Sequence, residues 1–340
     1  MRAVRFHAHG GPEVLRLETA PDPEPRPGQV VVRVRACALN HLDLWQRRGL
    51  DRVAIPMPHI SGADVAGDVV EAPNGEFPPG TRVFLQPGLS CGRCAACLAG
   101  QDNTCPSYDV LGYQSDGGYA EYVRVPAVNV VPIPAAVSHV AAAAFPLTFL
   151  TAWHMLVTRA RVAAGETVLV LAAGSGVGQA AIQVARLHGA RVIATAGSAA
   201  KLERARALGA HEVIDHHASD ITAEVRRLTG KRGVDVVVEH VGQATWAKSV
   251  RALAPGGRLV TCGNTTGWDA AIDLRFLFSR QLSLLGSYMG TKAELLLAAQ
   301  FLFDGRFQPL IDAVLPLASA ADAHRRLEAG DVCGKLVLTP

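Results

Sequence analysis

From residue 167 onward the sequence repeats one pattern, in which a short apolar run is followed by an amphipathic stretch. The amphipathic stretches, such as QAAIQVARLHG and KLERARALGA, have the apolar spacing of helices. The apolar runs are typical of buried strands and cover residues 167–173, 191–196, 211–216, 234–242 and 257–263. Strands that alternate with helices predict parallel βαβ units. We therefore expect an α/β fold with a doubly wound parallel sheet, and a sixth strand within QLSLLGSYMG.

Two domains are expected, because 340 residues exceed what one hydrophobic core usually supports. Residues 1–125 contain short β-type runs broken by Pro and Gly, such as QVVVRVRACAL and DVAGDVV, and predict a β-rich first domain. The alternating segment is expected to form the second domain, residues 126–291. Residues 292–340 end in the apolar run GKLVLTP and are expected to return to the first domain.

Composition narrows the class of partner. Hydrophobic residues make up 49% of the chain and charged residues 19%, and 33 Lys and Arg against 30 Asp and Glu leave a net charge of only +3. A net charge this close to zero does not predict nucleic-acid binding. The N-terminus lacks the apolar core of a signal peptide, and no segment has about 18 uninterrupted apolar residues. We expect a cytoplasmic protein that acts on a small molecule and binds neither nucleic acid nor membranes.

Four cysteines lie within residues 88–107, with the spacing C-x2-C-x2-C-x7-C. They are Cys91, Cys94, Cys97 and Cys105. In a reducing compartment this spacing favours a zinc site over disulfides. Because four thiolates complete a tetrahedral shell, no position remains for water or substrate. The sequence predicts one structural Zn²⁺ per chain, which folds a surface lobe and takes no part in chemistry.

A glycine-rich turn, AAGSGVGQ, joins the first strand of the alternating segment to its first helix. Such a turn lets a pyrophosphate approach the backbone and lie against the helix N-terminus. When the motif G-x-G-x-x-G is aligned so that its third glycine is Gly178, Ala173 and Ser175 stand where its first two glycines would be. An ordinary tight turn therefore remains the alternative. The place of the turn in the alternation favours dinucleotide binding. The predicted cofactor residues here are Ala173, Gly174, Ser175, Gly176, Val177 and Gly178.

The end of the second strand distinguishes between the two nicotinamide cofactors. NAD-specific sites usually place Asp or Glu there, about 20 residues beyond the turn, to bind the ribose hydroxyls. This chain has ATAGSAAKLERA instead, in which Ser198 and Lys201 follow the strand. A Lys can neutralise a 2′-phosphate and a Ser can hydrogen-bond it. NADP(H) is therefore favoured over NAD(H), although Lys201 by itself fits a solvated helix position equally well.

Together these features resemble the medium-chain dehydrogenase/reductase superfamily along essentially the whole chain. The stretches ISGADVAGDVV, GGYAEYV, LTFLTAW and GKLVL support the resemblance. It implies a GroES-like catalytic domain, residues 1–125 and 292–340, that carries the cysteine lobe, and a Rossmann domain over residues 126–291. It also implies nicotinamide contacts by Asn264, in CGNTTG, and Ser287, in GSYMG, and a homodimer or homotetramer formed along FLFSRQLSLLGSYMG.

The resemblance also bears on a catalytic metal. Where zinc alcohol dehydrogenases of the superfamily carry the three ligands of a catalytic zinc, this sequence has Asn40, Ala63 and Leu147. A methyl group and an isobutyl group cannot coordinate a metal, so we expect that the catalytic zinc is absent. The run ALNHLDLW resembles the A-x-G-L-N-x-x-D run of the quinone oxidoreductase branch instead. Trp45 and Gln46 replace tyrosines common after that run, which leaves the proton donor open.

Loss of the metal favours conjugate reduction over alcohol oxidation, because a carbonyl without a Lewis acid loses several kcal/mol of charge stabilisation. Hydride delivery to the β-carbon of an enone gives an enolate that hydrogen-bond donors can stabilise. Asn40 is the predicted donor, supported by Asp43 and Asp64. The alternative for Asn40 is a turn-forming role, and for the two acids scaffold hydrogen bonds are favoured over proton transfer.

Three functions remain in competition. The leading one is an NADPH-dependent enone or quinone reductase with one structural zinc. The second is a zinc-containing NAD(P)-dependent alcohol dehydrogenase whose metal site draws on Cys37, His59 and Asp64. The third is a catalytically silent NADPH-binding protein, which only a turnover measurement distinguishes from the first.

Overall fold

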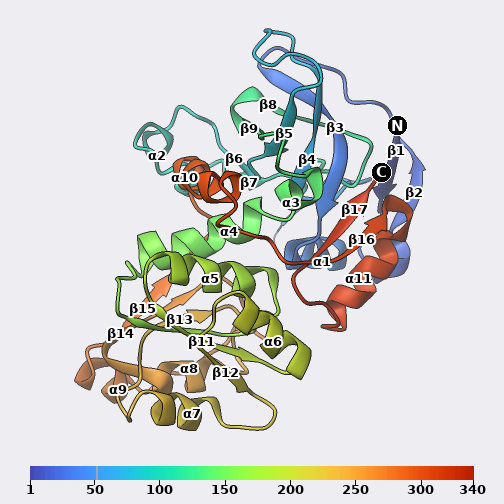
Figure 1. Ribbon diagram of the computed structural model, residues 1–340. Coiled ribbons are helices and arrows are strands. Elements are labelled where there is room, and N and C mark those ends of the chain that lie inside the picture. The colour runs from blue at the N-terminus through green and yellow to red at the C-terminus, as the bar shows by residue number, and fades with distance from the viewer. Residues whose placement is uncertain (51–52) are drawn as a thin grey trace. The chain divides into compact units, whose positions relative to one another are not determined.

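The computed structural model describes residues 1–50 and 53–340, which form two compact units (Figure 1). The first unit consists of Met1–Leu147 together with Thr291–Pro340, and the second of Thr148–Gly290. The C-terminal segment therefore belongs with the N-terminal part of the chain. Within the described residues, no helix has both the length and the apolar character needed to cross a membrane.

The boundary between the units falls later in the chain than the sequence analysis placed it. Residues 126–147, assigned there to the second domain, lie in the first unit. The reason is that strand β9 (Val130–Pro132) pairs antiparallel with β5 (Arg82–Leu85), and helix α3 (His139–Ala143) packs on the same sheet. This segment completes a β-sheet before the βα alternation begins.

The second unit contains a six-stranded parallel sheet with the strand order β12-β11-β10-β13-β14-β15. The strands are β10 (Thr167–Val170), β11 (Arg191–Ala196), β12 (Glu212–Asp215), β13 (Val234–Glu239), β14 (Leu253–Thr261) and β15 (Ser283–Gly286). The helices between them are α5 (Gly176–Leu187), α6 (Ala199–Ala207), α7 (Ile221–Leu228), α8 (Trp246–Ala252) and α9 (Leu274–Ser279). The expected doubly wound sheet is confirmed. Its strand order reverses between β10 and β13, where sheets of this kind bind ligands at the carboxyl ends of the strands.

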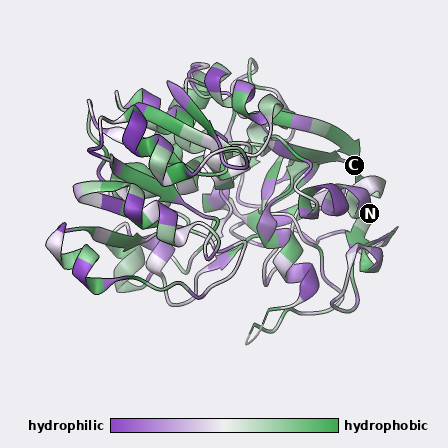
Figure 2. Cartoon of the chain, turned by 90° about the horizontal axis from the view of Figure 1, so that it is seen from below, coloured by the Kyte–Doolittle hydropathy of each residue, from purple (hydrophilic) through white to green (hydrophobic). Residues whose placement is uncertain are grey.

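The strands of this sheet are hydrophobic along most of their length (Figure 2). Leu169, Ile193 and Val237, one from each of three neighbouring strands, are completely buried. Continuous apolar runs are expected where helices cover both faces of a parallel sheet. These strands could therefore be recognised in the sequence as continuous apolar segments, although their polar and apolar residues do not alternate.

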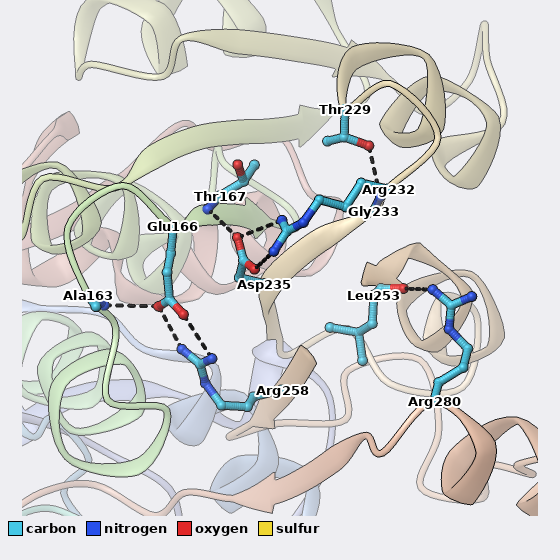
Figure 3. A network of polar contacts seen from close by, with 10 residues as sticks. All are labelled: Ala163, Glu166, Thr167, Thr229, Arg232, Gly233, Asp235, Leu253, Arg258 and Arg280. Carbon is cyan, nitrogen blue, oxygen red and sulfur yellow. Dashed lines mark hydrogen bonds and ion pairs between the residues drawn. The ribbon is translucent and has the colours of Figure 1, made fainter. Parts of the chain in front are cut away.

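Ion pairs hold the amino ends of the central strands (Figure 3). Glu166, just before β10, forms a two-pronged pair with Arg258 of β14, with N–O distances of 2.9 and 2.7 Å. Asp235 of β13 accepts the backbone N–H of Thr167 at 2.8 Å and pairs with Arg232. These contacts tie β10, β13 and β14 together and leave the carboxyl ends of the strands open to other groups.

The first unit is built on a mostly antiparallel sheet with the order β16-β17-β3-β4-β5-β9, and β8 adds to it by pairing with β3. Its further strands are β3 (Gln29–Ala38), β4 (Asp64–Glu71), β8 (Tyr122–Pro126), β16 (Ile311–Pro316) and β17 (Lys335–Thr339). Two small sheets pair β1 (Arg2–Arg5) with β2 (Arg16–Thr19) and β6 (Gly88–Leu89) with β7 (Asp109–Val110). The helices are α1 (His41–Arg48), α2 (Ala95–Leu98), α4 (Pro146–Trp153), which begins here, α10 (Lys292–Phe303) and α11 (Ala320–Glu328). The expected β-rich domain is confirmed.

Three neighbouring strands of this sheet bring distant polar residues to one place. β3 pairs antiparallel with β4, with Ala38 opposite Asp64, and antiparallel with β17, with Ala38 opposite Val337. The end of β3 therefore lies beside the starts of β4 and β17 (Figure 1). As a result, Asn40, Asp64 and Lys335 meet at this edge of the sheet.

Candidate functional site

Asn40, Asp64 and Lys335 form a closed set of hydrogen bonds in the first unit. The ammonium of Lys335 donates to Asn40 Oδ1 at 2.6 Å and to Asp64 Oδ2 at 3.0 Å. Asn40 Nδ2 donates to the same oxygen of Asp64 at 3.0 Å, and the other oxygen of Asp64 accepts the backbone N–H of Leu147 at 2.8 Å. Asp64 has no exposed surface, and Lys335 is only 3% exposed. The two buried charges satisfy each other, as buried ion pairs must.

Asp43 lies beside this set, in the first turn of α1. Its Oδ2 accepts the backbone N–H of Asn40 at 2.7 Å and the hydroxyl of Tyr119 at 3.1 Å. Its other oxygen has no hydrogen-bond partner among the described residues. Burial raises the pKa of the Asp43 carboxyl to about 6, opposed by the N–H of Asn40, the charge of Lys335 and the Tyr119 hydroxyl. This carboxyl therefore exchanges its proton near neutral pH.

A chain of hydrogen bonds leads from Asp43 toward the surface. His324 is fully buried, and burial together with the neighbouring Arg47 lowers its pKa to about 3, so its imidazole is neutral. Nδ1 of His324 accepts from Arg47 at 3.2 Å, which assigns the proton to Nε2, 3.3 Å from the Tyr119 hydroxyl. Tyr119 donates in turn to Asp43, and Arg47 pairs with Glu328. The donors of His324 and Tyr119 therefore point along this chain toward the Asp43 carboxyl.

The structure brings the predicted residues Asn40, Asp43 and Asp64 together, and hydrogen bonds join them to one another and to other groups of the protein. The amide of Asn40, predicted to face a substrate carbonyl, donates to Asp64 and accepts from Lys335. The bonded oxygens of the two acids accept hydrogen bonds from groups of the protein, which is the arrangement expected of scaffold residues. Sequence reasoning missed Lys335, and the signal for it was a charged residue at the start of the apolar run KLVLT.

Among the residues that the structure describes, only the four cysteines of the lobe form a close group of three or more metal-binding side chains. The alternative ligand set of Cys37, His59 and Asp64 is not brought together. His59 is buried and its Nε2 lies 3.0 Å from the carbonyl oxygen of Gly112, while Asp64 is engaged as described above. These three side chains are therefore not a close group of metal ligands in this structure.

The four cysteines of the lobe have the arrangement that zinc requires. The Sγ atoms of Cys91, Cys94, Cys97 and Cys105 all lie within 4.8 Å of one another, and those of Cys91 and Cys97 are 4.0 Å apart. Zn–S bonds of about 2.3 Å in a tetrahedron place the sulfurs about 3.8 Å apart. The donor set thus fits Zn²⁺, which binds thiolates.

The glycine-rich turn follows β10 and opens helix α5. A Cβ on Gly178 would lie 2.4 Å from the carbonyl oxygen of Ala172, so this close approach of helix and strand requires glycine. The hydroxyl of Ser175 accepts the N–H of Gly178 at 2.9 Å and caps the helix. The N–H groups of Gly176 and Val177 have no acceptor within the helix. The turn therefore offers backbone donors and the positive end of the helix dipole to a pyrophosphate.

Positively charged and imidazole side chains surround the end of β11. The methylene groups of Lys201 pass over the turn, where a Cβ on Gly174 would come within 2.8 Å of Lys201 Cδ. A Cβ on Gly197 would lie 2.5 Å from Nε2 of His217 and 2.9 Å from Nε2 of His216. Burial, followed by the adjacent His217, lowers the pKa of His216.

Ser198 has a defined structural role at the same strand end. It caps α6, where its hydroxyl accepts the N–H of Lys201 at 3.4 Å. β11 ends at Ala196 and is followed by Gly197 and Ser198, so no carboxylate follows this strand directly.

Asn264 and Ser287 follow the carboxyl ends of β14 and β15. The carbonyl oxygen of Asn264 accepts the N–H of Gly267 at 3.0 Å. The N–H of Ser287 donates to the carbonyl oxygen of Thr261 at 2.8 Å. The hydroxyl of Ser287 is buried and has no partner among the described residues. This hydroxyl is a polar group that a bound ligand can satisfy.

Comparison with known proteins adds family relationships to this geometry. Two family models match, an alcohol dehydrogenase GroES-like domain over residues 26–135 and a zinc-binding dehydrogenase over residues 176–304. A quinone oxidoreductase of Pongo abelii is 31% identical over 349 residues, covering 99% of this chain and 97% of the relative. A crystal structure of an NAD-dependent alcohol dehydrogenase is 50% identical, with a TM-score of 0.97 and 100% of both chains covered. A cobalt- and zinc-bound thermostable alcohol dehydrogenase from Pyrobaculum aerophilum is 35% identical, with a TM-score of 0.91, and covers 100% of this chain and 99% of that one.

These matches extend over both units and agree with the strand orders described above. The GroES-like and Rossmann classes expected from the sequence are confirmed. The relatives are named as dehydrogenases and oxidoreductases, so this chain is an enzyme of the same kind. The chain belongs to the medium-chain dehydrogenase/reductase superfamily of nicotinamide-dependent oxidoreductases.

Proposed function

We propose that this enzyme reduces enones or quinones with NADP(H) and uses no catalytic metal. The observation that carries the proposal is the set of Asn40, Asp64 and Lys335, in which an amide, a carboxylate and an ammonium satisfy one another. A lysine ammonium repels a metal cation, and the nearby Leu147 has no ligand atom in its side chain. The quinone oxidoreductase among the relatives is in keeping with an acceptor of this type.

The second unit supports NADP(H) as the cofactor. The glycine-rich turn is suited to the pyrophosphate, and Lys201, His216 and His217 supply charge and hydrogen bonds for a 2′-phosphate. The orphaned hydroxyl of Ser287 and the neighbouring strand end at Asn264 are candidates for contact with nicotinamide. NAD(H) is the alternative, in view of the NAD-dependent alcohol dehydrogenase that is 50% identical to this chain.

When bound, NADPH supplies the hydride. The protein must then stabilise the negative charge that develops on the substrate oxygen. Asn40 is 6% exposed, whereas Asp43 and Asp64 have no exposed surface, so a bound molecule can reach Asn40 more readily than the two acids. Apart from its bond to Asp64, Asn40 Nδ2 makes only a 3.5 Å contact with the carbonyl oxygen of Ala38. In this proposal the N–H in the long contact with Ala38 turns to the substrate oxygen, and solvent supplies the proton at carbon.

The cysteine lobe has a separate role in this proposal. Four converging sulfurs would hold one structural Zn²⁺, with every coordination position taken by protein. Residues 88–107 are otherwise short of regular structure, with a four-residue helix at Ala95–Leu98. The metal would therefore stabilise the fold of the lobe and leave the reduction to the rest of the first unit.

Turnover of purified enzyme tests the proposal against its two alternatives. We expect reduction of cyclohex-2-enone and 1,4-naphthoquinone with NADPH, at rates unchanged after dialysis against a chelator that leaves the structural zinc in place. Oxidation of benzyl alcohol with NAD⁺, lost on mild chelation, would establish the alcohol dehydrogenase instead. Tight binding of NADPH without reduction of any acceptor would identify the silent cofactor-binding protein.

A further inference from the structure

Lys335 is the only buried lysine among the described residues, and its charge belongs to no surface network. We propose that the Lys335 ammonium is a positioning group for the reduction, which orients and polarises the Asn40 amide and offsets the Asp64 carboxylate beside it. The inference rests on the proposed function. It names the side chain that supplies, in the absence of a catalytic metal, the positive charge near the developing oxyanion.

The sheet holds the ammonium in a fixed position. Lys335 opens β17 and Asn40 follows β3, and these strands are neighbours in the sheet. The 2.6 Å hydrogen bond from Lys335 to Asn40 Oδ1 is charge-assisted, which makes it short and strong. A cation on the amide oxygen draws electron density from the amide nitrogen and makes its N–H groups stronger donors. The second N–H of Asn40, whose bond to the carbonyl oxygen of Ala38 is long at 3.5 Å, is therefore a better donor to a substrate oxygen than an ordinary amide.

The charges around the amide show why a cation is needed there. The Asp64 carboxylate lies 3.0 Å from Asn40 Nδ2 and would repel an oxyanion that approaches the amide. Lys335 contacts the same carboxylate oxygen at 3.0 Å and offsets its charge. Asp43, the other acid next to the set, has its pKa raised toward neutrality by burial. Without Lys335, the nearest full charge to the amide would be negative.

The reaction balances with the groups named. Hydride from NADPH forms a bond to the β-carbon of the enone, and the carbon–carbon π pair moves so that negative charge resides on the oxygen. The enolate then takes a proton from water at the α-carbon, giving a saturated ketone and NADP⁺. The oxyanion exists only between these steps, so Lys335 is expected to act on kcat and not on the affinity for NADPH.

The first test compares Lys335→Met with a double variant, Asp64→Asn with Lys335→Met. The single variant leaves a buried carboxylate without its partner, so its thermal unfolding temperature should fall, and kcat for cyclohex-2-enone should fall about 10- to 100-fold. The double variant removes both charges, so the unfolding temperature should recover while kcat stays low. Lys335→Arg should keep most of the activity, and Lys292→Met, which changes a half-buried lysine elsewhere in the first unit, serves as the control. NADPH binding, followed by fluorescence, should be the same in all variants.

A second readout separates charge stabilisation from a purely structural role. The enolate of cyclohex-2-enone is a stronger base than the hydroquinone anion formed from 1,4-naphthoquinone, so it depends more on the polarised amide. The loss of kcat in the double variant should therefore be larger for the enone. Recovery of kcat together with the unfolding temperature, or an equal loss for both acceptors, would overturn the inference while the proposed function stands. A wild-type enzyme that binds NADPH but reduces neither acceptor would overturn both.

Discussion

Replacing Asp43 by Asn is expected to change how stability depends on pH. The Asp43 carboxyl is fully buried, and burial raises its pKa to about 6, compared with about 3.9 in an unfolded chain. The folded state holds the Asp43 proton more tightly than the unfolded chain does. The protonated carboxyl therefore adds to the free energy of unfolding below about pH 4, and this contribution is lost as the pH rises through about 6. A difference of about 2 pKa units corresponds to about 3 kcal/mol.

Urea unfolding of the wild type and of Asp43→Asn between pH 4 and pH 8 measures this effect. Asn has the shape of the protonated carboxyl and keeps one oxygen for the N–H of Asn40 and the hydroxyl of Tyr119. The two proteins should be about equally stable near pH 4, and the variant should be more stable by up to about 3 kcal/mol above pH 7. Other groups titrate alike in both proteins, so their contributions cancel in the difference between the two free energies of unfolding. A difference that does not change with pH, or a variant that becomes the less stable protein above pH 7, would refute the reasoning.

We make further predictions for the cysteine lobe, for Lys201 and for the glycine-rich turn. Replacing Cys94 and Cys97 by Ser should remove the zinc of the lobe and lower the thermal unfolding temperature, measured by elemental analysis and calorimetry, whereas Cys333→Ser, outside the lobe, should do neither. Lys201→Ala should weaken NADPH binding about tenfold and leave NADH binding unchanged in fluorescence titrations, and an equal loss for both cofactors would contradict a 2′-phosphate site there. Gly178→Ala, which sets a methyl 2.4 Å from a backbone oxygen, should abolish cofactor binding or folding in the same titration.

The parallel sheet could be predicted from the sequence because its strands are local signals. Each is a short apolar run buried on both faces, and helical spacing separates one run from the next. The residues at which the strands end were harder to predict from the sequence. The run predicted over residues 234–242 ends as a strand at Glu239, because its carboxylate accepts the N–H groups of Val241 and Gly242 and closes a turn.

The polar cluster of the first unit could be predicted only in part. Asn40, Asp43 and Asp64 were found because they lie in motifs that resemble those of the superfamily. Lys335 contacts Asp64 across 271 residues of sequence, and that contact depends on which strands are neighbours in the sheet. Local patterns carry no information on such pairing. The same limit explains why residues 126–147, which complete the first sheet through β9, were assigned to the second domain.

The metal content of the purified enzyme tests the central claim of metal-free reduction most directly. The account predicts one zinc per chain, bound by the four cysteines, and NADPH-dependent enone reduction by that same one-zinc protein. Two zincs per chain, with activity that follows the occupancy of the second, would contradict it. That result would place a metal where the structure has Asn40, Asp64 and Lys335 bonded to one another.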